Sequence, residues 1–483
     1  MKIQSLIREH DRLIPVDVEV TFLPGLPTVQ FLGLPDQVIK ESIHRIKSAI
    51  RSQGFEFPKA QQVLVNLRPN HLKKSSRGIE LAVAAAILWN TDQIPLPQEE
   101  DVLLYGELGL KGEVFEPEDL GRDFEADKEL QILTGQGGEG NVPFHRAVIK
   151  ELQNLRDPEV IPAAVREFEI VRPVYGLELE FPERQAKLLE LAALGEHSVL
   201  LAGPAGSGKS TLAKTLSSLL ARPTQGDLRT IFKNSKASTE EPPRWRPVVQ
   251  PHHTTSPLGL VGGGVPPYKG EITRAHKGVL ILDELLEFHP KAQEALREPM
   301  EESCIRLRRG RFVDEYPAEA FVISTTNLCP CGDWVPNTNV MCGRSLKKCQ
   351  SYTERLSGPL VDRFQLVFFT QKRETGARIK GSDILAKLEE VRVFREERAL
   401  VDSRYQKLAC RWSLEELYQG LSSFYREQLF PKELSSRRRE LSTLRVARSL
   451  ADLEMKVDLQ SEHIEQALKW TYLPFEALKR LGC

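Results

Sequence analysis

Alternating apolar and polar positions dominate the first third of the chain. The segment VDVEVTFLPGLPTVQFLGLP (16–35) alternates in both halves and is interrupted by a Pro-Gly pair, which predicts a strand hairpin. Further predicted elements follow in chain order: a helix over 36–54, a strand over 61–67 and a buried helix over 79–90. Residues 1–172 are therefore expected to form an α/β unit.

From about residue 173 the pattern changes to short apolar segments that alternate with helical ones. The expected strands are SVLLAG (198–203), GVLILDE (278–284) and AFVISTTN (320–327). Buried strands that alternate with helices are typical of a parallel sheet covered on both faces. The segment 222–247, rich in Pro, Lys and Glu, is expected to be an exposed excursion.

Helical periodicity without a strand pattern marks the chain after about residue 372. The predicted helical segments are 383–400, 413–429, 434–456 and 461–480. The pattern thus predicts an α/β protein with three parts, at 1–172, 173–372 and 373–483, and the last part is helical.

The charge balance limits the kinds of partner. Sixty-six basic and 67 acidic residues leave a formal charge of −1, so a polyanion would have to meet a local basic patch. The longest apolar run, Leu81–Trp89, is about half the length of a membrane-spanning helix, and charges interrupt the N-terminus where a signal peptide is apolar. Seven cysteines, an odd number, argue against a disulfide framework. We therefore expect a cytoplasmic protein without a membrane partner.

A complete G-x-x-x-x-G-K-S motif follows the predicted strand 198–203. Its residues are Gly203, Pro204, Ala205, Gly206, Ser207, Gly208, Lys209 and Ser210. Glycines allow backbone N–H groups to cradle phosphates at a helix N-terminus. Lys209 would contact the β- and γ-phosphates of ATP, and the Ser210 hydroxyl would bind Mg²⁺. A glycine-rich turn capping an ordinary helix is the alternative, and the strand–loop–helix context disfavours it.

Two adjacent carboxylates end the next apolar strand. Asp283 and Glu284 follow VLIL at the strand edge where α/β sheets place ligands. Asp283 would join the Mg²⁺ shell, and Glu284 would orient and deprotonate the attacking water. Such a pair alone is usually a solvated turn, but together with the phosphate loop it predicts nucleotide hydrolysis.

Several longer segments resemble the magnesium-chelatase-like group of AAA+ ATPases, in particular the ComM/YifB family. The resembling segments are PHHTTSPLGLVGGG (251–264), GEITRAHKGVLILDE (270–284), ALREPMEE (295–302), NLCPCG (327–332) and RLSGPLVDRFQL (355–366), with FLGLPDQVIKESIHRIKSAIRSQGFEFP and VNLRPNHLKKSS near the N-terminus. The resemblance implies an N-terminal Lon-protease-like domain of the ribosomal S5 domain 2-like fold, an AAA+ P-loop core and a C-terminal helical lid.

The resemblance also implies roles for single residues. Asn327 matches the sensor-1 residue, which would contact the attacking water or the γ-phosphate. Arg363 matches the arginine finger, which acts in trans on the next subunit, and would otherwise be a surface arginine. Arg438 matches the sensor-2 arginine in cis, with Arg437 and Arg439 as alternatives of neighbouring register. Because a finger completes a neighbour's site, the resemblance implies a homo-oligomeric ring, expected to be hexameric.

Four of the cysteines cluster in one short segment. Cys329, Cys331, Cys342 and Cys349 could close a tetrahedral, structural Zn²⁺ site between sensor 1 and the finger helix. Reduced thiols in a cysteine-rich loop are the alternative.

Two basic segments correspond to hairpins that project into the pore of the family's rings. The candidate DNA contacts are Arg306, Arg308, Arg309 and Arg311 in one, and His252, His253, Lys269 and Arg274 in the other. Guanidinium groups suit phosphate because they donate two hydrogen bonds and keep their charge. Solvated turns and packed loops are the alternatives.

A Lon-like fold raises the question of proteolysis by a Ser–Lys pair. Ser75 and Ser76 fall near the expected serine, but Gly121 stands near the expected lysine. A serine without its base is a weak nucleophile, so we expect a non-proteolytic domain. The function expected from the resemblance is an ATP-driven ring motor on DNA, a helicase or branch-migration motor in uptake and integration of DNA. A chelatase-type motor that remodels a protein partner is the alternative, and an ATP-dependent protease is the third.

Overall fold

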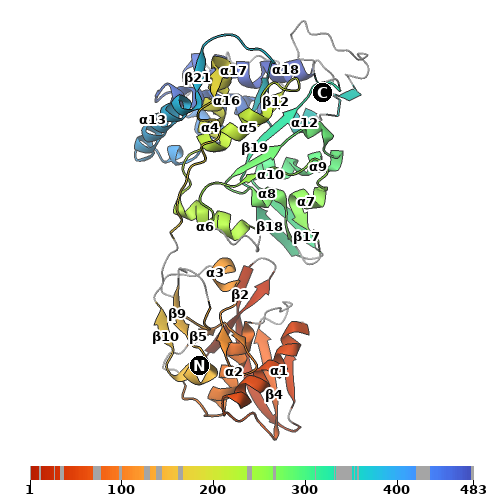
Figure 1. Cartoon of the computed structure of the whole chain (residues 1–483), viewed down its shortest axis with the longest axis vertical. Helices are drawn as coiled ribbons and strands as arrows, with labels where there is room; N and C mark the ends of the chain where they lie inside the picture. Colours follow the sequence, from red (N-terminus) through yellow and green to blue (C-terminus); the bar gives the residue numbers. More distant parts are fainter. Residues whose placement is uncertain are drawn as a thin grey trace. The chain divides into compact units, whose positions relative to one another are not determined.

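The computed structural model describes most of the chain, in segments separated by gaps. The described residues are 2–9, 12–26, 28–32, 37–68, 78–96, 101–124, 131–137, 144–161, 167–235, 242–264, 268–309, 312–330, 332, 351–352, 354–355, 358–419 and 436–479. The chain divides into two compact units, residues 1–167 and 168–483 (Figure 1). The expected further boundary at 372 stays a prediction, since both of its sides lie within the second unit.

An eight-stranded mixed sheet organises the first unit. Its strands in spatial order are β10 (Glu159–Ile161), β9 (His145–Val148), β8 (Gln131–Thr134), β5 (Asp101–Leu104), β1 (Lys2–Glu9), β2 (Arg12–Pro24), β4 (Gln61–Arg68) and β3 (Val29–Leu32). The remaining elements are α1 (Gln37–Ser52), α2 (Ile79–Asn90), the strand pair β6 (Glu107–Leu108) and β7 (Val114–Phe115), α3 (Leu120–Asp123) and the 3₁₀ turn η1 (Leu152–Arg156).

The predicted hairpin over 16–35 is wrong. Strand β4 lies between the two halves, antiparallel to β2 and parallel to β3. The antiparallel neighbour that directly precedes β2 is β1, with Glu9 opposite Arg12. Alternation identifies strands that are covered on one face, but it carries no information about which strand pairs with which.

The predicted helix over 79–90 forms as α2 and is buried along nearly all its length. Residues Ile79–Trp89 are buried, and they pack with α1 and the sheet in one apolar cluster. The one charged residue in this run, Glu80, is fully buried and accepts hydrogen bonds from Ser42, Arg45 and the backbone N–H of Leu108. Because a buried carboxylate without partners is costly, these contacts explain how the apolar helix tolerates it.

A five-stranded parallel sheet organises the second unit. Its order is β13 (Val248–Val249), β16 (Val279–Leu282), β19 (Phe321–Thr326), β12 (Val199–Ala202) and β20 (Leu366–Phe369), with all neighbours parallel. Every residue of the four strands other than β13 is buried, as the continuous apolar runs predict. The predicted parallel α/β fold is confirmed.

Helices cover both faces of this sheet (Figure 1). One face packs against α4 (Glu183–Gly195), α5 (Lys209–Leu219), α13 (Gly381–Ala399), α16 (Arg437–Leu453) and α17 (Ser461–Thr471). The other packs against α7 (Pro257–Val261), α8 (Glu271–Arg274), α9 (Pro290–Ala295), α10 (Arg297–Glu302), α12 (Gly358–Val361) and α18 (Leu473–Lys479). The other described helical turns are η2 (Leu285–Glu287), η3 (Ser403–Gln406), η4 (Ala409–Arg411) and α14 (Leu414–Tyr418).

Short strand pairs and one extra helix complete the second unit. The pairs are β11 (Glu180–Pro182) with β21 (Arg378–Lys380), β14 (Gly262–Gly263) with β15 (Tyr268–Lys269), and β17 (Cys304–Arg309) with β18 (Phe312–Pro317). The presence of β21 corrects the expectation that no strand follows residue 372. Helix α6 (Gln225–Asn234) corrects the expectation of an exposed excursion over 222–247, because its Leu228 and Ile231 are buried against Phe168.

Candidate functional site

The glycine-rich loop joins a buried strand to a helix, as its sequence predicts. Strand β12 ends at Ala202 and α5 begins at Lys209, at the carboxyl edge of the parallel sheet. Gly206 and Gly208 have φ values of 74° and 84°, in the left-handed region that glycine adopts without strain. This loop–helix arrangement can present backbone N–H groups to a phosphate at a helix N-terminus.

The neighbouring strand supports the loop through a residue that sequence reasoning missed. Thr370 directly follows β20, and its Oγ1 lies 2.6 Å from Ser207 Oγ, which also donates to the Pro204 carbonyl at 2.7 Å. A Cβ at Gly203 would lie 2.3 Å from Thr370 Oγ1, so only glycine fits there. The position of Thr370 at the end of a buried strand was the only available signal in the sequence.

Lys209 brings the phosphate loop and the predicted sensor together. Its Nζ donates to the carbonyls of Gly203 and Pro204, each at 2.8 Å, and to Asn327 Oδ1 at 3.1 Å. Burial lowers the pKa of the Lys209 ammonium, while attraction by Asp283 and Glu284 opposes that change. The cation therefore lies close to both carboxylates, in the mouth of the loop.

The Thr325 hydroxyl, on strand β19, contacts the Asp283 carboxylate and the backbone of Glu284. The Thr325 hydroxyl donates to Asp283 Oδ1, and it accepts the backbone N–H of Glu284 at 3.0 Å. Thr325 is buried, whereas Asp283 is half-buried and Glu284 is exposed. One oxygen of Asp283 is thus held by the protein and Glu284 remains open to solvent. Sequence reasoning missed Thr325, which lies two residues before Asn327.

The residues at this edge fit a magnesium ion. Ser210 is exposed at the start of α5, and Asp283 follows β16 at the same edge of the sheet. Hydroxyl and carboxylate oxygens are the hard ligands that Mg²⁺ prefers, and Mg²⁺ keeps several waters beside them. Ser210 and Asp283 would therefore hold the ion, which would neutralise charge on the phosphates.

Replacement of Thr325 tests whether it orients Asp283. We expect Thr325→Val, which keeps the side-chain shape, to raise the half-saturating Mg²⁺ concentration about threefold to tenfold, because a net hydrogen bond contributes about 1 kcal/mol. Thr325→Ser should restore the parent value. The measurements are ATPase against free Mg²⁺ and Mn²⁺ binding in the presence of ATP by electron paramagnetic resonance. Identical metal dependence in the valine and serine variants would contradict this role.

The loop after Asn327 contacts the phosphate loop. The Ala205 N–H donates to the Gly332 carbonyl at 2.8 Å, and the Gly332 N–H donates to the Cys329 carbonyl at 3.0 Å. Cys329 is buried, but Cys331, Cys342 and Cys349 lie outside the described residues. Among the side chains that are described, no three potential metal ligands lie together. The zinc site therefore stays a prediction.

Arg363 lies at the amino edge of the sheet, opposite the phosphate loop. It precedes β20, which runs parallel to β12, and its carbonyl accepts the Ser198 hydroxyl just before β12 begins. Four strand residues, or roughly 13 Å at about 3.3 Å per residue, separate this edge from the loop. Arg363 therefore lies across the sheet from the nucleotide site of its own chain.

Arg438 lies at the same edge and shares a partner with Arg363. Arg363 Nη2 is 2.9 Å from Glu301 Oε2, and Arg438 Nη2 is 2.5 Å from Glu301 Oε1. Helix α16, which carries Arg438, starts beside the residues that precede β20, at the edge away from the phosphate loop, and the cis role of Arg438 stays a prediction. Sequence reasoning also missed Glu301, the acceptor common to both arginines.

Arg439, one of the alternatives for sensor 2, is buried and held by contacts within the chain. Its side chain is 2% exposed, and Nε pairs with Asp362 at 2.8 Å. Its Nη2 donates to the carbonyls of Val361, Asp362 and Phe364, and its guanidinium stacks on Phe475. These contacts fix the start of α16 against the segment that carries Arg363.

The predicted DNA contacts are only partly described. Arg306 is exposed on β17, where it pairs with Glu315 at 3.2 Å and has Glu298 and Glu302 within 4.0 Å. Arg308 and Arg309 belong to the same strand, but their side chains and all of Arg311 lie outside the described residues. The hairpin forms as predicted, and its one described arginine is surrounded by carboxylates.

The other candidate DNA contacts have partners within the chain. His252 Nδ1 lies 2.8 Å from Thr254 Oγ1, and the His252 and His253 rings lie 4.1 Å apart. Lys269 donates to the carbonyl of Lys233, and Arg274 pairs with Glu271 at 2.6 Å. Their role in DNA binding stays a prediction.

The structure of the first unit describes only one of the positions expected for a Ser–Lys pair. Gly121 belongs to the short helix α3, so the position predicted for the lysine carries no side chain. Ser75 and Ser76 lie outside the described residues. The expectation of a non-proteolytic domain therefore stays a prediction that rests on Gly121.

One edge of the parallel sheet brings together the phosphate loop, the carboxylate pair and the strand-end asparagine. This combination, together with a helical lid, defines the class of AAA+ P-loop ATPases. Comparisons with known proteins agree: residues 178–378 match the family described as magnesium chelatase, subunit ChlI, and residues 18–119 match subunit ChlI of Mg-chelatase. The chain belongs to the ComM/YifB family of magnesium-chelatase-like AAA+ ATPases.

Some relatives match over almost the whole chain, and another matches about a third of it. YifB of Salmonella typhimurium, described as uncharacterized, is 30% identical over 94% of each chain. Competence protein ComM of Haemophilus influenzae is also 30% identical over 94% of each chain. Lon protease 2 of Bacillus subtilis is 27% identical over 34% of this chain and 32% of its own length, which agrees with the Lon-like fold. No described helix combines the length and apolar character of a membrane span.

Proposed function

We propose that the protein is a ring-forming ATPase that moves along DNA, a ComM-type helicase or branch-migration motor in DNA uptake and recombination. One observation carries the ring: the chain's own site holds Lys209, Asp283, Glu284 and Asn327, while Arg363 lies on the opposite edge of the sheet. Because the arginine that matches the finger lies away from this site, a neighbouring chain would have to supply it.

The residues of the chain's own edge divide the work of hydrolysis. The phosphate loop and Lys209 hold the phosphates, and Mg²⁺ held by Ser210 and Asp283 supplies charge neutralisation. Glu284 orients the attacking water and accepts its proton, and Asn327, already within reach of Lys209, contacts the water or the terminal phosphate.

The residues of the opposite edge serve the next subunit. Arg363 and Arg438 both pair with Glu301, so both would face a neighbour's terminal phosphate. There the two guanidinium groups would stabilise the negative charge that develops during phosphoryl transfer. A closed ring with one such heterologous interface per subunit follows, and a hexamer is the size typical of the class.

The DNA partner rests on three supports. The segments quoted above resemble a family of DNA motors, one relative is called a competence protein, and residues 306–311 hold four arginines in a chain whose net formal charge is −1. The test is the ATPase rate with and without single-stranded, duplex and forked DNA. Stimulation by DNA supports the proposal, and a rate indifferent to all three forms would reject it.

Removal of charged side chains from the hairpin β17–β18 tests whether the hairpin contacts DNA phosphates. We expect alanine at Arg306, Arg308, Arg309 and Arg311 to weaken DNA binding and to reduce the slope of log affinity against log salt by about 0.9 for each lost contact. ATPase without DNA should stay near the parent rate. Glu315→Gln is the matched variant: it frees Arg306 from its carboxylate and should strengthen DNA binding. Fluorescence anisotropy at several salt concentrations measures the DNA affinity and its salt dependence. Unchanged slopes would mean that DNA binds elsewhere on the protein.

A protein-remodelling motor is the second candidate. Three carboxylates surround Arg306, so the described part of the hairpin is of mixed charge rather than basic. A surface of mixed charge is better suited to binding a protein partner than to binding a phosphate backbone. ATPase that no DNA form stimulates, together with a hairpin variant that keeps its DNA affinity, would favour this candidate.

A further inference from the structure

Glu301 is the last but one residue of α10, and its carboxylate joins two guanidinium groups from distant segments. Oε2 accepts from Arg363, which precedes β20, and Oε1 accepts from Arg438, in the first turn of α16. Burial raises the pKa of this carboxyl, but the two guanidinium groups outweigh burial and hold its pKa below the ordinary value. Glu301 is therefore charged near neutral pH and neutralises two cations that would otherwise repel each other.

The two arginines differ in how firmly the chain holds them. Arg363 is 12% exposed and also donates to the carbonyls of Arg297 at 3.1 Å and Pro359 at 2.6 Å. Arg438 is 48% exposed, and Glu301 is 39% exposed. The carbonyls orient the Arg363 guanidinium, while the carboxylate occupies the remaining side, where an anion from outside the chain would have to bind.

A terminal phosphate and a carboxylate compete for the same donors. Both accept two hydrogen bonds from guanidinium groups in fork geometry, and the phosphate carries the larger charge. In a ring, the phosphate on the neighbouring subunit can therefore replace Glu301, but only after the two ion pairs have been broken. The strength of those pairs is subtracted from the neighbour's affinity for ATP.

We propose that Glu301 is a built-in competitor, which occupies Arg363 and Arg438 until the neighbouring subunit's terminal phosphate displaces it. This inference rests on the proposed function, since it requires both arginines to act on a neighbour. Glu301 acts through the arginines and makes no contact with the reacting atoms.

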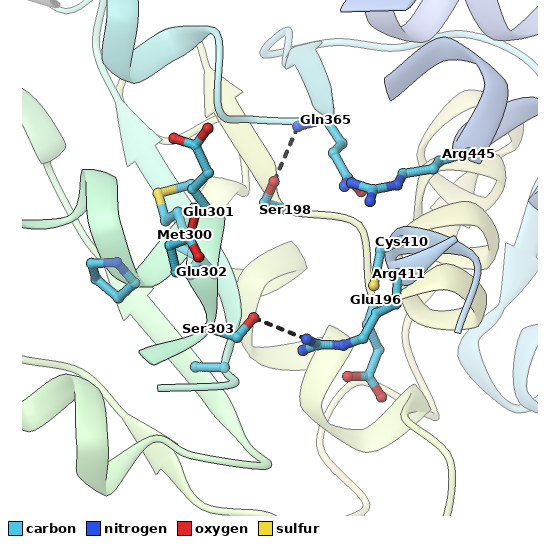
Figure 2. A pocket seen from close by; sticks show the side chains of 13 residues that line it. Glu196, Ser198, Met300, Glu301, Glu302, Ser303, Gln365, Cys410, Arg411 and Arg445 are labelled. Carbon is cyan, nitrogen blue, oxygen red and sulfur yellow. Dashed lines mark hydrogen bonds between the residues drawn. The ribbon is translucent and has the colours of Figure 1, made fainter. Parts of the chain in front are cut away.

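The surroundings of Glu301 allow the carboxylate to move away. Glu301 lines a cavity of about 320 Å³ at the amino edge of the sheet, beside Ser198 and Gln365 (Figure 2). Arg445 and Arg411 line the same cavity from the lid (Figure 2). Arg445 donates to the Trp412 carbonyl, and burial lowers the pKa of its guanidinium. Glu196 and Glu302 also line the cavity, and Arg411 pairs with Glu319 at 3.2 Å, so the cavity offers room to a displaced carboxylate but no excess of positive charge.

The test compares Glu301→Gln with Glu302→Gln in the full-length protein. The first substitution keeps the side-chain shape without the charge, and Glu302 is the adjacent, 53% exposed carboxylate whose ion-pair contact in the structure is with Arg306 at 4.0 Å. We expect Glu301→Gln to lower the half-saturating ATP concentration about fivefold, the scale of two partly exposed ion pairs, with kcat within about twofold of the parent. Glu302→Gln should match the parent. Assembly against ATP concentration, followed by mass photometry, should shift in the same direction.

Other outcomes overturn the inference, and one of them separates it from the proposed function. A lower kcat at unchanged KM would mean that Glu301 orients the arginines for catalysis, and identical behaviour of Glu301→Gln and Glu302→Gln would mean a surface ion pair. Both results contradict a competitor but leave the ring intact. Arg363→Ala and Arg438→Ala supply the separate readout: if neither impairs hydrolysis, the trans role in the proposed function fails as well.

Discussion

Lys209→Ala should abolish ATP binding, whereas Glu284→Gln should bind ATP and fail to hydrolyse it. Lys209 is the cation at the mouth of the phosphate loop, so its loss removes the charge that holds the phosphates. Glu284 is exposed, and its replacement by Gln leaves the hydrogen bonds of Lys209 to Gly203, Pro204 and Asn327 in place, so proton transfer is the main loss. Removal of a general base costs about 10²- to 10⁴-fold in rate.

Fluorescent-nucleotide titration and steady-state ATPase separate the two effects. Lys214→Ala, an exposed lysine on the same helix α5, is the matched control and should behave like the parent. Normal turnover by either Lys209→Ala or Glu284→Gln would exclude this edge of the sheet as the catalytic site.

Mixtures of two inactive variants should recover activity if the arginines act across an interface. Arg363→Ala subunits keep an intact phosphate loop, and Lys209→Ala subunits keep an intact finger. In randomly mixed rings at equal amounts, roughly a quarter of the interfaces combine the two intact halves. Because the structure places Arg438 beside Arg363, Arg438→Ala mixed with Lys209→Ala should recover activity too.

The second mixture distinguishes the two placements of Arg438. A cis role leaves every site with one lesion, so no rescue would occur, whereas a trans role permits it. ATPase is measured across the mixing ratio, and mass photometry of size-tagged subunits shows that mixed rings form. Failure of rescue in rings that demonstrably mix would contradict the trans assignment.

Local chemistry explains why the nucleotide edge was predictable. Gly206 and Gly208 need the left-handed backbone, Lys209 starts a helix, and Asp283 and Glu284 end a buried strand. Each of these properties is a matter of a few adjacent residues, and parallel strands bring their carboxyl ends to one edge. The same reasoning could not find Thr325 or Thr370, because a threonine in an apolar strand looks like any β-branched residue until its neighbours are known.

Contacts between distant segments decided the features of the fold and of the site that the sequence did not predict. Position in the sequence shows neither that β4 separates β2 from β3 nor that Arg438 lies with Arg363 rather than with the phosphate loop. Arg437, Arg438 and Arg439 are alike as residues, and only packing distinguishes the buried Arg439 on Asp362 from its exposed neighbour on Glu301.

The sequence by itself determined the class of this protein, because a phosphate loop, a strand-end carboxylate pair and apolar strands are each encoded by short stretches of chain. Only the tertiary structure decided which arginines face away from the chain's own nucleotide and which carboxylate holds them. The physical reason is that an ion pair such as Glu301 with Arg363 and Arg438 depends on contacts between residues 62 and 137 positions apart, and side-chain chemistry alone does not specify such distances.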